Sequence, residues 1–580
     1  MTSATQESIA SYLDDACRAT ADGLARLGAV ISVDAIAASI EYPNRKDFGD
    51  VAVPCFPLAQ SMRLAPAVIA QRLSESFVPP GSITRVKAIG GYFNLWFDPQ
   101  AIADVVLPRI LTEKSGFGSS TLGRGKTICM DYSHPNIAKP FGVGHLRSTV
   151  IGHALKNILE KLGYTTVGIN HLGDWGTQFG KLIVAFRDWG SEETIAREPI
   201  RHLYDLYVRF HQEAESNPSL DERARAEFRK LEDGDPDNRA LWKRFRDLSL
   251  QEFQRVYSRL GVTFDSDAGE AFYNDQLSPL IDRMVAVGAA RVGDDGALVV
   301  DVGQGDEPPL LLRKADGATL YATRDLAAAE YRHTTYGFDW CLYIVGSAQA
   351  LHFKQLFAAL KKMGHDWADS MVHVDFGWVK FGDEMMSTRR GNIVFLDEVL
   401  SEAVERARTI IAEKNPDLDD AGSIAEAVGI GAVVFWQLSA RRQRDVNFTW
   451  QDALSFDGRT GPYLQYTHAR ICSLIERSGQ AIPQGGFDSA ALSGDDERRV
   501  LLQLADWPRR IRMAAEQYEP HILAGALLDL AQTYNSFYQR VRILDGEESA
   551  RIPRLCLSQS VRWILAEGLR LLGLRAPERM

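Results

Sequence analysis

Cysteine is scarce in this sequence. The 580 residues include six cysteines, and no two of them form a Cys-x-x-Cys pair. Zinc ribbons and dithiol redox centres need such pairs, so the spacing excludes both kinds of site. We therefore expect reduced thiols in the core, no structural zinc and no metal ion held by protein ligands.

Long apolar runs and a basic leader are missing as well. No uninterrupted apolar stretch reaches the roughly 20 residues of a bilayer span, and the first ten residues lack the pattern of a secretory signal. A mean hydropathy of −0.17, with 45% hydrophobic and 24% charged residues, is typical of a globular chain rather than a disordered one. We expect a cytoplasmic protein without membrane association, of about three to five domains.

Positive charge is in short supply, and the formal net charge is −11. Since nucleic-acid binding needs basic surface, this value alone argues weakly against such a partner. The charge is uneven, however: residues 441–580 carry 19 Arg, no Lys and 17 Asp or Glu, a net charge of +2. This Arg-only C-terminal part is compatible with a local RNA-binding face.

Hydrophobic periodicity divides the chain into three parts. Residues 1–115 alternate helical and extended stretches, with one extended run at Tyr92–Phe97, and predict a small α/β domain. Residues 116–400 alternate strand-like and helical patterns. Residues 401–580 are helical in pattern almost throughout and predict a stem and an α-helical bundle, interrupted near 480–487.

The central part has the pattern of a parallel sheet. A helical stretch at 144–162 between two strand-like runs forms a βαβ unit, which is the building block of doubly wound sheets. A densely charged segment, 187–260, predicts a solvent-facing helical insertion. The expected strands are Thr127–Tyr132, Thr165–Asn170, Trp340–Val345 and His373–Val379. The predicted fold class is therefore multidomain α/β, with a Rossmann-type parallel-sheet domain between a small N-terminal α/β domain and a C-terminal helical bundle.

The stretch from Asp131 to Ser148 carries the clearest chemical signal. An expected strand ends in a Pro- and Gly-rich loop, and a helix begins near Gly144 with His145 in its first turn. Free N–H groups at a helix N-terminus bind anions, and His145 and Lys139 add a donor and a full positive charge. These residues predict a phosphate site, with an ordinary helix-capping loop as the alternative.

The same stretch resembles the HIGH region of class I aminoacyl-tRNA synthetases in its arginyl form. The resemblance lies in Ser-x-Pro-Asn-x-Ala-Lys before the motif and in Leu-Arg-Ser-Thr after it. Other segments resemble this family in the same order along the chain. They are 48–52, 90–95, 170–180, 321–325, 345–353, the KMSKS-like loop 385–391, 461–470 and 577–580.

The family implies a two-step reaction. L-Arginine and ATP, with Mg²⁺ on the nucleotide, give arginyl-adenylate, and the arginyl group then passes to the 3′-terminal adenosine of tRNA(Arg). Positioning and charge stabilisation suffice for such chemistry, without a nucleophilic side chain. We also expect a monomer. The family suggests that activation of arginine waits for bound tRNA, which the sequence leaves open.

The resemblance assigns roles to individual residues. For catalysis it implies Lys139, His145, Ser387 and Arg389. For ATP it implies Gly142, Gly144, His145, His352, Phe353 and Met386. For arginine it implies Asp131, Ser133, Asn136, Tyr321, Asp325 and Gln349. For tRNA it implies Asn94, Tyr463, Tyr466, Arg470 and Tyr534.

Two positions depart from the class pattern. Gly142 stands where the first His of HIGH belongs, and the KMSKS-like loop has Met385 and Thr388 where that motif has lysines. The family suggests that Lys139 supplies the missing charge, while a substitution by His134 stays open. Three other readings stay open too: a class I synthetase for another amino acid, a non-catalytic RNA-binding paralogue, and a nucleotidyltransferase acting on a small cofactor.

Overall fold

The structure is a computed structural model that describes residues 11–41, 43, 46–303, 308–315, 317–381 and 395–580. The N-terminal domain is a three-stranded antiparallel sheet of order β1-β3-β2, covered by helices. Its elements are α1 (Ser11–Arg26), α2 (Val33–Ser39), β1 (Val51–Pro54), α3 (Ala59–Met62), α4 (Pro66–Ser76), β2 (Ile83–Ile89) and β3 (Tyr92–Phe97). The expected extended run at 92–97 is confirmed as β3, the central strand, which buries Phe93, Leu95 and Phe97.

The central sheet is parallel and four-stranded, in the order β10-β9-β4-β5. Its strands are β4 (Thr127–Asp131), β5 (Thr165–Ile169), β9 (Trp340–Tyr343) and β10 (Met371–His373). Helix α6 (Val143–Lys161) connects β4 to β5, so the predicted βαβ unit is confirmed. Residues far apart in sequence lie side by side in register, as Cys129 and Cys341 do, and the sheet begun at β4 is completed some two hundred residues later.

One expected strand, His373–Val379, is wrong. The structure ends β10 at His373 and begins β11 (Val379–Phe381), which pairs in parallel with β12 (Val446–Phe448) outside the main sheet. Residues between them hydrogen-bond elsewhere: Ser347 N–H donates to the Phe376 carbonyl over 2.9 Å, and Gly377 N–H to the Arg442 carbonyl over 2.8 Å. The apolar pattern alone could not distinguish one strand from two.

The predicted helical insertion is present but begins earlier and packs inward. Its helices are α7 (Gln178–Trp189), α8 (Glu192–Arg197), α9 (Pro199–Ser216), α10 (Ser219–Glu232) and α11 (Pro236–Leu260). One face of the last turns of α11 is buried: the ring centroids of Phe253 and Tyr257 lie 5.7 and 5.4 Å from that of Phe141. The insertion therefore contacts the motif loop directly.

A second insertion between β5 and β9 was not predicted. It contains a 3₁₀ helix η4 (Glu270–Gln276), α12 (Leu277–Ala286) and a small antiparallel sheet, followed by α13 (Tyr321–Tyr336). The sheet strands are β6 (Arg291–Val292), β7 (Leu298–Val300) and β8 (Leu310–Arg313). These short strands leave too weak a pattern in the sequence to be recognised.

The C-terminal part is helical, as expected. Its helices are α15 (Leu396–Lys414), α16 (Ala421–Leu438), α17 (Trp450–Ala453), α18 (Gly461–Ser478), α19 (Asp495–Glu516), α20 (His521–Arg540) and α21 (Glu548–Leu571). Helix α5 (Pro99–Glu113) packs against α19 and α21, and α14 (Ala350–Lys362) lies between β9 and β10 in the chain. The loop after α18 matches the predicted break. Helix α16 has the length and apolar composition of a membrane span, but 67% of it is buried inside the protein, as in a core helix.

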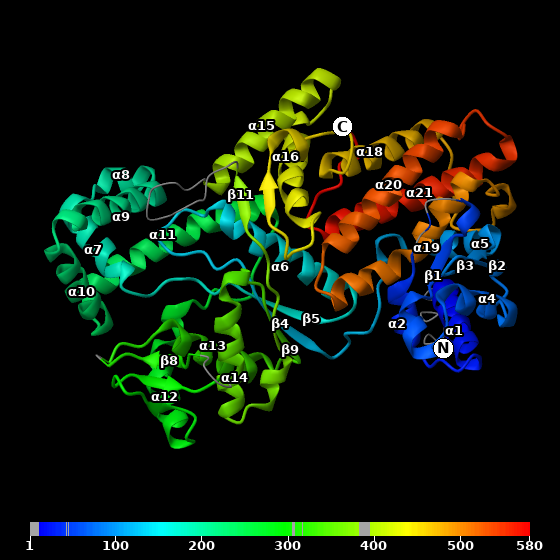
Figure 1. The fold of residues 1–580 in the computed structure, drawn as a ribbon. Helices are drawn as coiled ribbons and strands as arrows, with labels where there is room; N and C mark the ends of the chain where they lie inside the picture. The colour runs from blue at the N-terminus through cyan, green and yellow to red at the C-terminus, as the bar shows by residue number, and fades with distance from the viewer. Residues whose placement is uncertain (1–10, 42, 44–45, 304–307, 316, 382–394) are drawn as a thin grey trace.

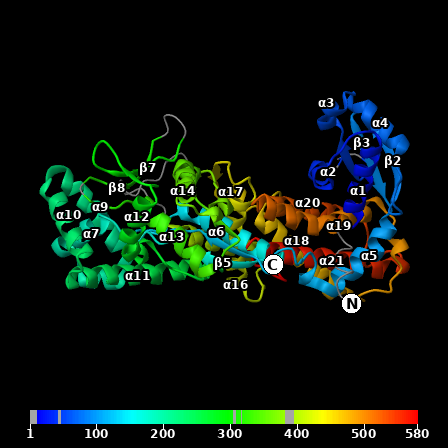
Figure 2. The same ribbon diagram turned by 90° about the horizontal axis from the view of Figure 1, so that it is seen from below.

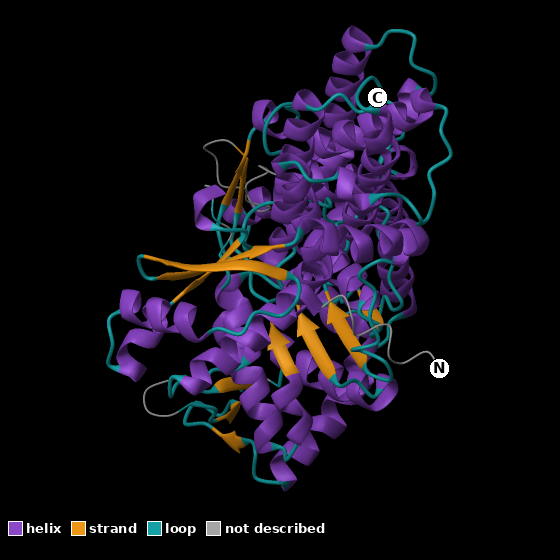
Figure 3. Ribbon diagram, turned by 90° about the vertical axis from the view of Figure 1, so that its right-hand side faces the viewer, coloured by secondary structure: helices purple, strands orange, loops and turns teal. Residues whose placement is uncertain are grey.

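The molecule is elongated. Figure 1 places the insertion helices α7 to α11 at one end, the N-terminal domain with α19 to α21 at the other, and the parallel strands between them. Figure 2 shows the same order along the long axis. In Figure 3 the strands form small groups among the helices. Helix α6 contacts α16, α19 and α21 as well as β4 and β5, so it joins the central sheet to the C-terminal helices.

Candidate functional site

The loop that follows β4 holds an unusual backbone. Three residues that are not glycine, Ser133, His134 and Ala138, have left-handed φ values of 83°, 54° and 60°. Each such residue costs of order 1–3 kcal/mol and persists only when its surroundings fix it. Here Ser133 N–H donates to Ser148 Oγ over 2.9 Å and Ala138 N–H to Ser249 Oγ over 2.9 Å. The loop is thus held in a rigid, strained shape, as loops at functional sites often are.

The N-terminus of α6 follows this loop, and Gly144 in its first turn is exposed. Gly142 is the N-cap, and its N–H donates to His145 Nδ1 over 3.2 Å. Burial lowers the pKa of His145 to about 4. The ring is therefore neutral at pH 7, with its proton on Nε2, and can donate one hydrogen bond. A Cβ added to Gly144 would meet no atom within 4 Å, so a bound group can approach the backbone there.

Lys139 lies in the same loop. Its ammonium nitrogen is 5.1 Å from the ring centroid of Tyr207 on α9. The helical insertion therefore holds this lysine beside the α6 N-terminus. The combination of N–H groups, a neutral imidazole donor and a lysine is suited to a phosphate.

A second cluster forms around Asp325 in the first turns of α13. His352 Nε2 lies 2.7 Å from Asp325 Oδ2, and His171 Nε2 lies 3.6 Å from Asp325 Oδ1. The Tyr321 ring stacks obliquely on His352, with centroids 4.9 Å apart, and is 59% exposed. Tyr321 and Asp325 share a helix face, as their spacing predicts. His352 therefore lies beside this acid, and its expected role toward ATP stays a prediction.

Sequence reasoning missed a second carboxylate in this cluster, Glu270 on η4. Burial, together with the nearby negative charge of Asp325, raises the pKa of Glu270 to about 8, although Arg324 opposes the shift. Two neighbouring carboxyl groups repel each other when both are ionised, and a cation bound between them removes that repulsion. A planar guanidinium fits such a pair of acids. Its only signal in the sequence is one acid among small and apolar residues, 268–273.

Asp131, expected at the substrate α-amino group, lies between two basic side chains of the chain itself. Its oxygens lie 2.8 Å from Arg332 Nη1 and 2.7 Å from His134 Nε2. Burial raises the pKa of Asp131, but the charges of Arg332 and His134 outweigh it and hold that pKa well below its usual range. Asp131 is therefore a charged, pre-oriented acid whose side chain is 5% exposed.

Two other expected substrate residues are as buried as Asp131, and both are engaged with residues of the chain. Ser133 is 2% exposed, and its hydroxyl bonds to Thr149 Oγ1 and the Tyr257 hydroxyl, so it shapes the loop instead of reaching outward. Phe353 is 5% exposed and stacks on His373 with centroids 4.6 Å apart. This phenylalanine is a core residue rather than an adenine platform.

The remaining substrate candidates border the same region. Asn136 forms a parallel bridge with Gly173, which fixes the middle of the motif loop. Gln349 is exposed at the N-cap of α14. Met386, Ser387 and Arg389, with the rest of the KMSKS-like loop, lie outside the described residues.

Of the tRNA candidates, two are corrected. Asn94 is 2% exposed and donates to the carbonyls of Lys87 and Tyr92, so it holds the β2–β3 hairpin together. Tyr534 is 0% exposed in the core of the C-terminal helices. Neither side chain can stack on a base.

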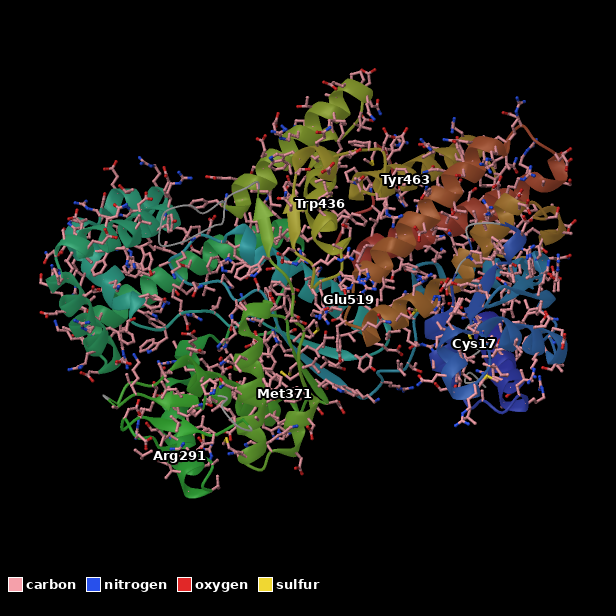
Figure 4. The ribbon with its side chains drawn as sticks, in the orientation of Figure 1. Cys17, Arg291, Met371, Trp436, Tyr463 and Glu519 are labelled. Atoms are coloured by element: carbon pink, nitrogen blue, oxygen red, sulfur yellow. The ribbon has the colours of Figure 1, made fainter. Side chains whose placement is uncertain are left out.

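The other three tRNA candidates share one face of α18. The Arg470 guanidinium lies 4.8 Å above the Tyr466 ring and donates to Asn535 over 2.8 Å. Asn535 in turn donates to the Tyr463 hydroxyl over 2.9 Å. Tyr466 is 36% exposed, and Figure 4 labels Tyr463 on α18.

Comparison with known proteins agrees with this geometry. The family model "tRNA synthetases class I (R), catalytic domain" matches residues 106–450, the "DALR anticodon binding domain" 464–580, and the "Arginyl tRNA synthetase N terminal domain" 5–97.

Two curated relatives and one solved structure match nearly the whole chain. The relatives are named arginine--tRNA ligase: one from Clostridioides difficile is 47% identical over 95% of this chain and 97% of its own, and one from Exiguobacterium sibiricum is 49% identical over 96% and 98%. The Thermus thermophilus arginyl-tRNA synthetase structure has a TM-score of 0.82 at 27% identity, covering 98% of this chain and 100% of that one. The chain belongs to the arginyl-tRNA synthetase family of class I synthetases, the arginine–tRNA ligases.

Proposed function

We propose that this arginine–tRNA ligase binds ATP phosphates at the N-terminus of α6 and the arginine guanidinium at Asp325 and Glu270. The observation that carries the proposal is the set of contacts and charge interactions between the two places. His134, which lowers the pKa of His145 electrostatically, bonds to Asp131, and both Asp131 and Asp325 act on His171. An anion site and a cation site therefore meet at the carboxyl end of β4.

The guanidinium side provides the specificity. A guanidinium presents five donors in one plane, and Asp325, Glu270 and the Tyr321 hydroxyl supply acceptors. A site whose acids are arranged for a guanidinium loses those hydrogen bonds when the substrate lacks a cation, so it rejects such substrates by roughly 10⁴ or more. Asp131 and Asn136 supply the acceptors for the α-amino end, with Asp131 fixed in place by Arg332.

The phosphate side provides the stabilisation of charge. In the first step the arginine carboxylate attacks the α-phosphorus, and pyrophosphate leaves. The Nε2–H of neutral His145, the first N–H groups of α6 and the Lys139 ammonium face the oxygens on which negative charge grows. In the second step a ribose hydroxyl of the terminal adenosine of tRNA attacks the arginyl carbonyl, and AMP leaves.

Mg²⁺ accompanies the nucleotide in this proposal. No group of three or more His, Cys, Asp or Glu residues in the described part of the chain is arranged to hold a metal ion. Phosphate oxygens and water are the ligands that Mg²⁺ prefers. The ion would neutralise phosphate charge, while the residues named above orient both substrates.

We further propose that tRNA(Arg) contacts the α18 face of Tyr463, Tyr466 and Arg470, and that the enzyme acts as a cytoplasmic monomer. Exposed aromatic rings paired with an arginine suit base stacking and phosphate contact. Light scattering coupled to gel filtration tests the oligomeric state: a mass near 64.5 kDa supports the monomer, and twice that value contradicts it.

The direct test of the proposed function is ATP–pyrophosphate exchange with each of the twenty amino acids, with and without bulk tRNA. We expect exchange with arginine alone, and only when tRNA is present. Exchange with another amino acid would contradict the guanidinium site. No exchange despite tight tRNA binding would support the non-catalytic alternative.

A further inference from the structure

Arg147 on α6 is a buried cation that the reaction described above does not use. It is 0% exposed and stands two positions after His145 in the sequence. Its hydrogen bonds go to backbone carbonyls, while the negative charges of Asp445 and Glu519 partly offset the effect of burial, which lowers its pKa. Its Nη2 donates to the carbonyl oxygens of Arg442 (2.9 Å) and Arg444 (2.8 Å). Its Nε and Nη1 are buried without a hydrogen-bond partner among the described residues. Burying a guanidinium in this way is costly, which calls for a specific purpose.

The carbonyl of Arg442 joins two parts of the site. It accepts from Arg147 Nη2 over 2.9 Å and from the Gly377 N–H over 2.8 Å. The two segments run so close that a Cβ on Gly377 would lie 2.7 Å from the Gln443 carbonyl. Segment 441–446 therefore lies between α6 and segment 375–378 and is hydrogen-bonded to both.

An ion pair and further hydrogen bonds stabilise the same contact between segments 441–446 and 375–378. Arg442 Nη1 lies 2.6 Å from Asp375 Oδ1, and the Trp378 N–H donates to Asp445 Oδ1 over 2.8 Å. Glu519, between α19 and α20, accepts from the Arg442 N–H over 3.2 Å. Figure 4 shows Glu519 at the end of the C-terminal helices that lies nearest to α6.

Segment 375–378 continues the connection to the arginine side. The Ser347 N–H donates to the Phe376 carbonyl over 2.9 Å, and Gly346 bridges Phe376 in parallel. This bridge sets the start of the turn that ends in Gln349. A continuous path of hydrogen bonds therefore runs from α6, which carries His145, to the loop that carries Gln349.

We propose that Arg147 is a positioning residue that holds the phosphate-binding end of α6 in register with the Gln349 loop, acting through segments 441–446 and 375–378. The Nη2 group of Arg147 donates to two carbonyls of this segment, and the rigid plane of the guanidinium fixes the direction of both bonds. The inference rests on the proposed roles of His145 and Gln349. Since Arg147 touches neither substrate, its loss should misalign two bound substrates rather than weaken the binding of either.

The test is steady-state ATP–pyrophosphate exchange, with tRNA present, for Arg147→Lys and Arg147→Met. We expect kcat to fall about 10-fold for the lysine variant and about 100-fold for the methionine variant. KM for arginine and for ATP should stay within about twofold of wild type, because the residues that bind the two substrates are unchanged. Unchanged kcat in both variants, or a rise in KM at constant kcat, would overturn the proposal.

Two further variants keep the test decisive. Arg498→Met is the matched control: Arg498 contacts Asp50 and donates to the Phe97 carbonyl of the N-terminal domain over 3.1 Å, far from the motif loop. It should leave the exchange kcat unchanged. Asp445→Ala removes the acceptor of the Trp378 N–H at an exposed position, so the protein should fold, and we expect the same kcat-only loss.

The outcomes also separate this inference from the proposed function. Wild-type protein that shows no arginine-dependent exchange contradicts the function itself. Active wild type with full kcat in Asp445→Ala and in a folded Arg147 variant contradicts only the positioning role. If both Arg147 variants fail to fold, the Asp445→Ala result decides.

Discussion

At the scale of single residues, burial sets the protonation of two groups in the proposed site. His145 is neutral because burial lowers its pKa to about 4, so at pH 7 it donates from Nε2 without adding a full charge. Glu270 is mostly protonated near neutral pH, because burial and Asp325 raise its pKa to about 8. A bound cationic substrate favours the ionised form of Glu270 and therefore lowers the pKa of this acid again.

The pH dependence of arginine binding should therefore follow Glu270. Below its pKa the acid is neutral and above it the acid is ionised, while the arginine guanidinium stays charged throughout. We expect the dissociation constant for arginine to fall about tenfold between pH 6.5 and 8.5. Isothermal titration calorimetry across this range measures it. Glu270→Gln should show a flat profile; a slope that persists in that variant assigns the titration to another group.

Lys139 is the second residue for which we predict a measurable role. Lys139→Ala removes a full positive charge beside the α6 N-terminus, and we expect the exchange rate to fall by about 10² or more. Lys181→Ala is a matched control, since Lys181 also lies over an aromatic ring of α9, 5.5 Å from the centroid of Phe210. It should retain the wild-type rate. Equal losses in both variants would contradict the role of Lys139.

At the scale of elements, α6 has two glycines with different purposes. A Cβ at Gly152 would lie 2.3 Å from Tyr132 Cγ, so this glycine lets the helix pack closely on the end of β4. A Cβ at Gly144 would meet nothing within 4 Å. One glycine thus serves packing, while the other leaves open space at the site.

These glycines give a paired prediction. Gly152→Ala overpacks the contact with Tyr132 and should lower the free energy of unfolding by about 1–3 kcal/mol. Gly144→Ala should leave that free energy unchanged or slightly higher, yet raise KM for ATP, because the methyl group occupies space that a phosphate would use. Urea denaturation and exchange kinetics separate the two effects. Strong destabilisation by Gly144→Ala would be inconsistent with its open surroundings.

Local pattern predicted the long elements well and the short ones poorly. Helix α6 and strands β3, β4, β5 and β9 have continuous periodicity over several residues, so the sequence indicated them. The division of 371–381 into β10 and β11 depends on hydrogen bonds to segments near residues 346 and 442, which no local window contains. The strands β6 to β8 are two to four residues long and gave no usable pattern.

At the scale of the whole molecule, α6 also ties the central sheet to the C-terminal helices. Lys161 near its end pairs with Glu567 on α21 over 2.9 Å, and the two side chains are 4% and 3% exposed. Glu567 additionally accepts from Arg570 over 2.8 Å. Breaking one half of a buried pair leaves an uncompensated charge, so this contact should couple the unfolding of both parts.

Glu567→Gln tests that coupling. We expect a loss of about 3 kcal/mol in the free energy of unfolding, seen by urea denaturation with both tryptophan fluorescence and circular dichroism. The control is Glu476→Gln, whose partner Arg579 lies 2.9 Å away with both side chains more than 60% exposed. An exposed pair contributes less than about 1 kcal/mol. Equal effects of the two variants would contradict a special role for the buried pair.

The sequence by itself determined the family resemblance, the βαβ unit and the residues of the motif loop, because these depend on local spacing and order along the chain. Only the tertiary structure decided which side chains reach the site. It placed His352 beside Asp325, added Glu270 and buried Ser133, Phe353, Asn94 and Tyr534. Burial and ionisation depend on neighbours hundreds of residues away, as Arg147 and Arg442 show. Such contacts depend on how distant segments pack together, so local sequence patterns cannot predict them.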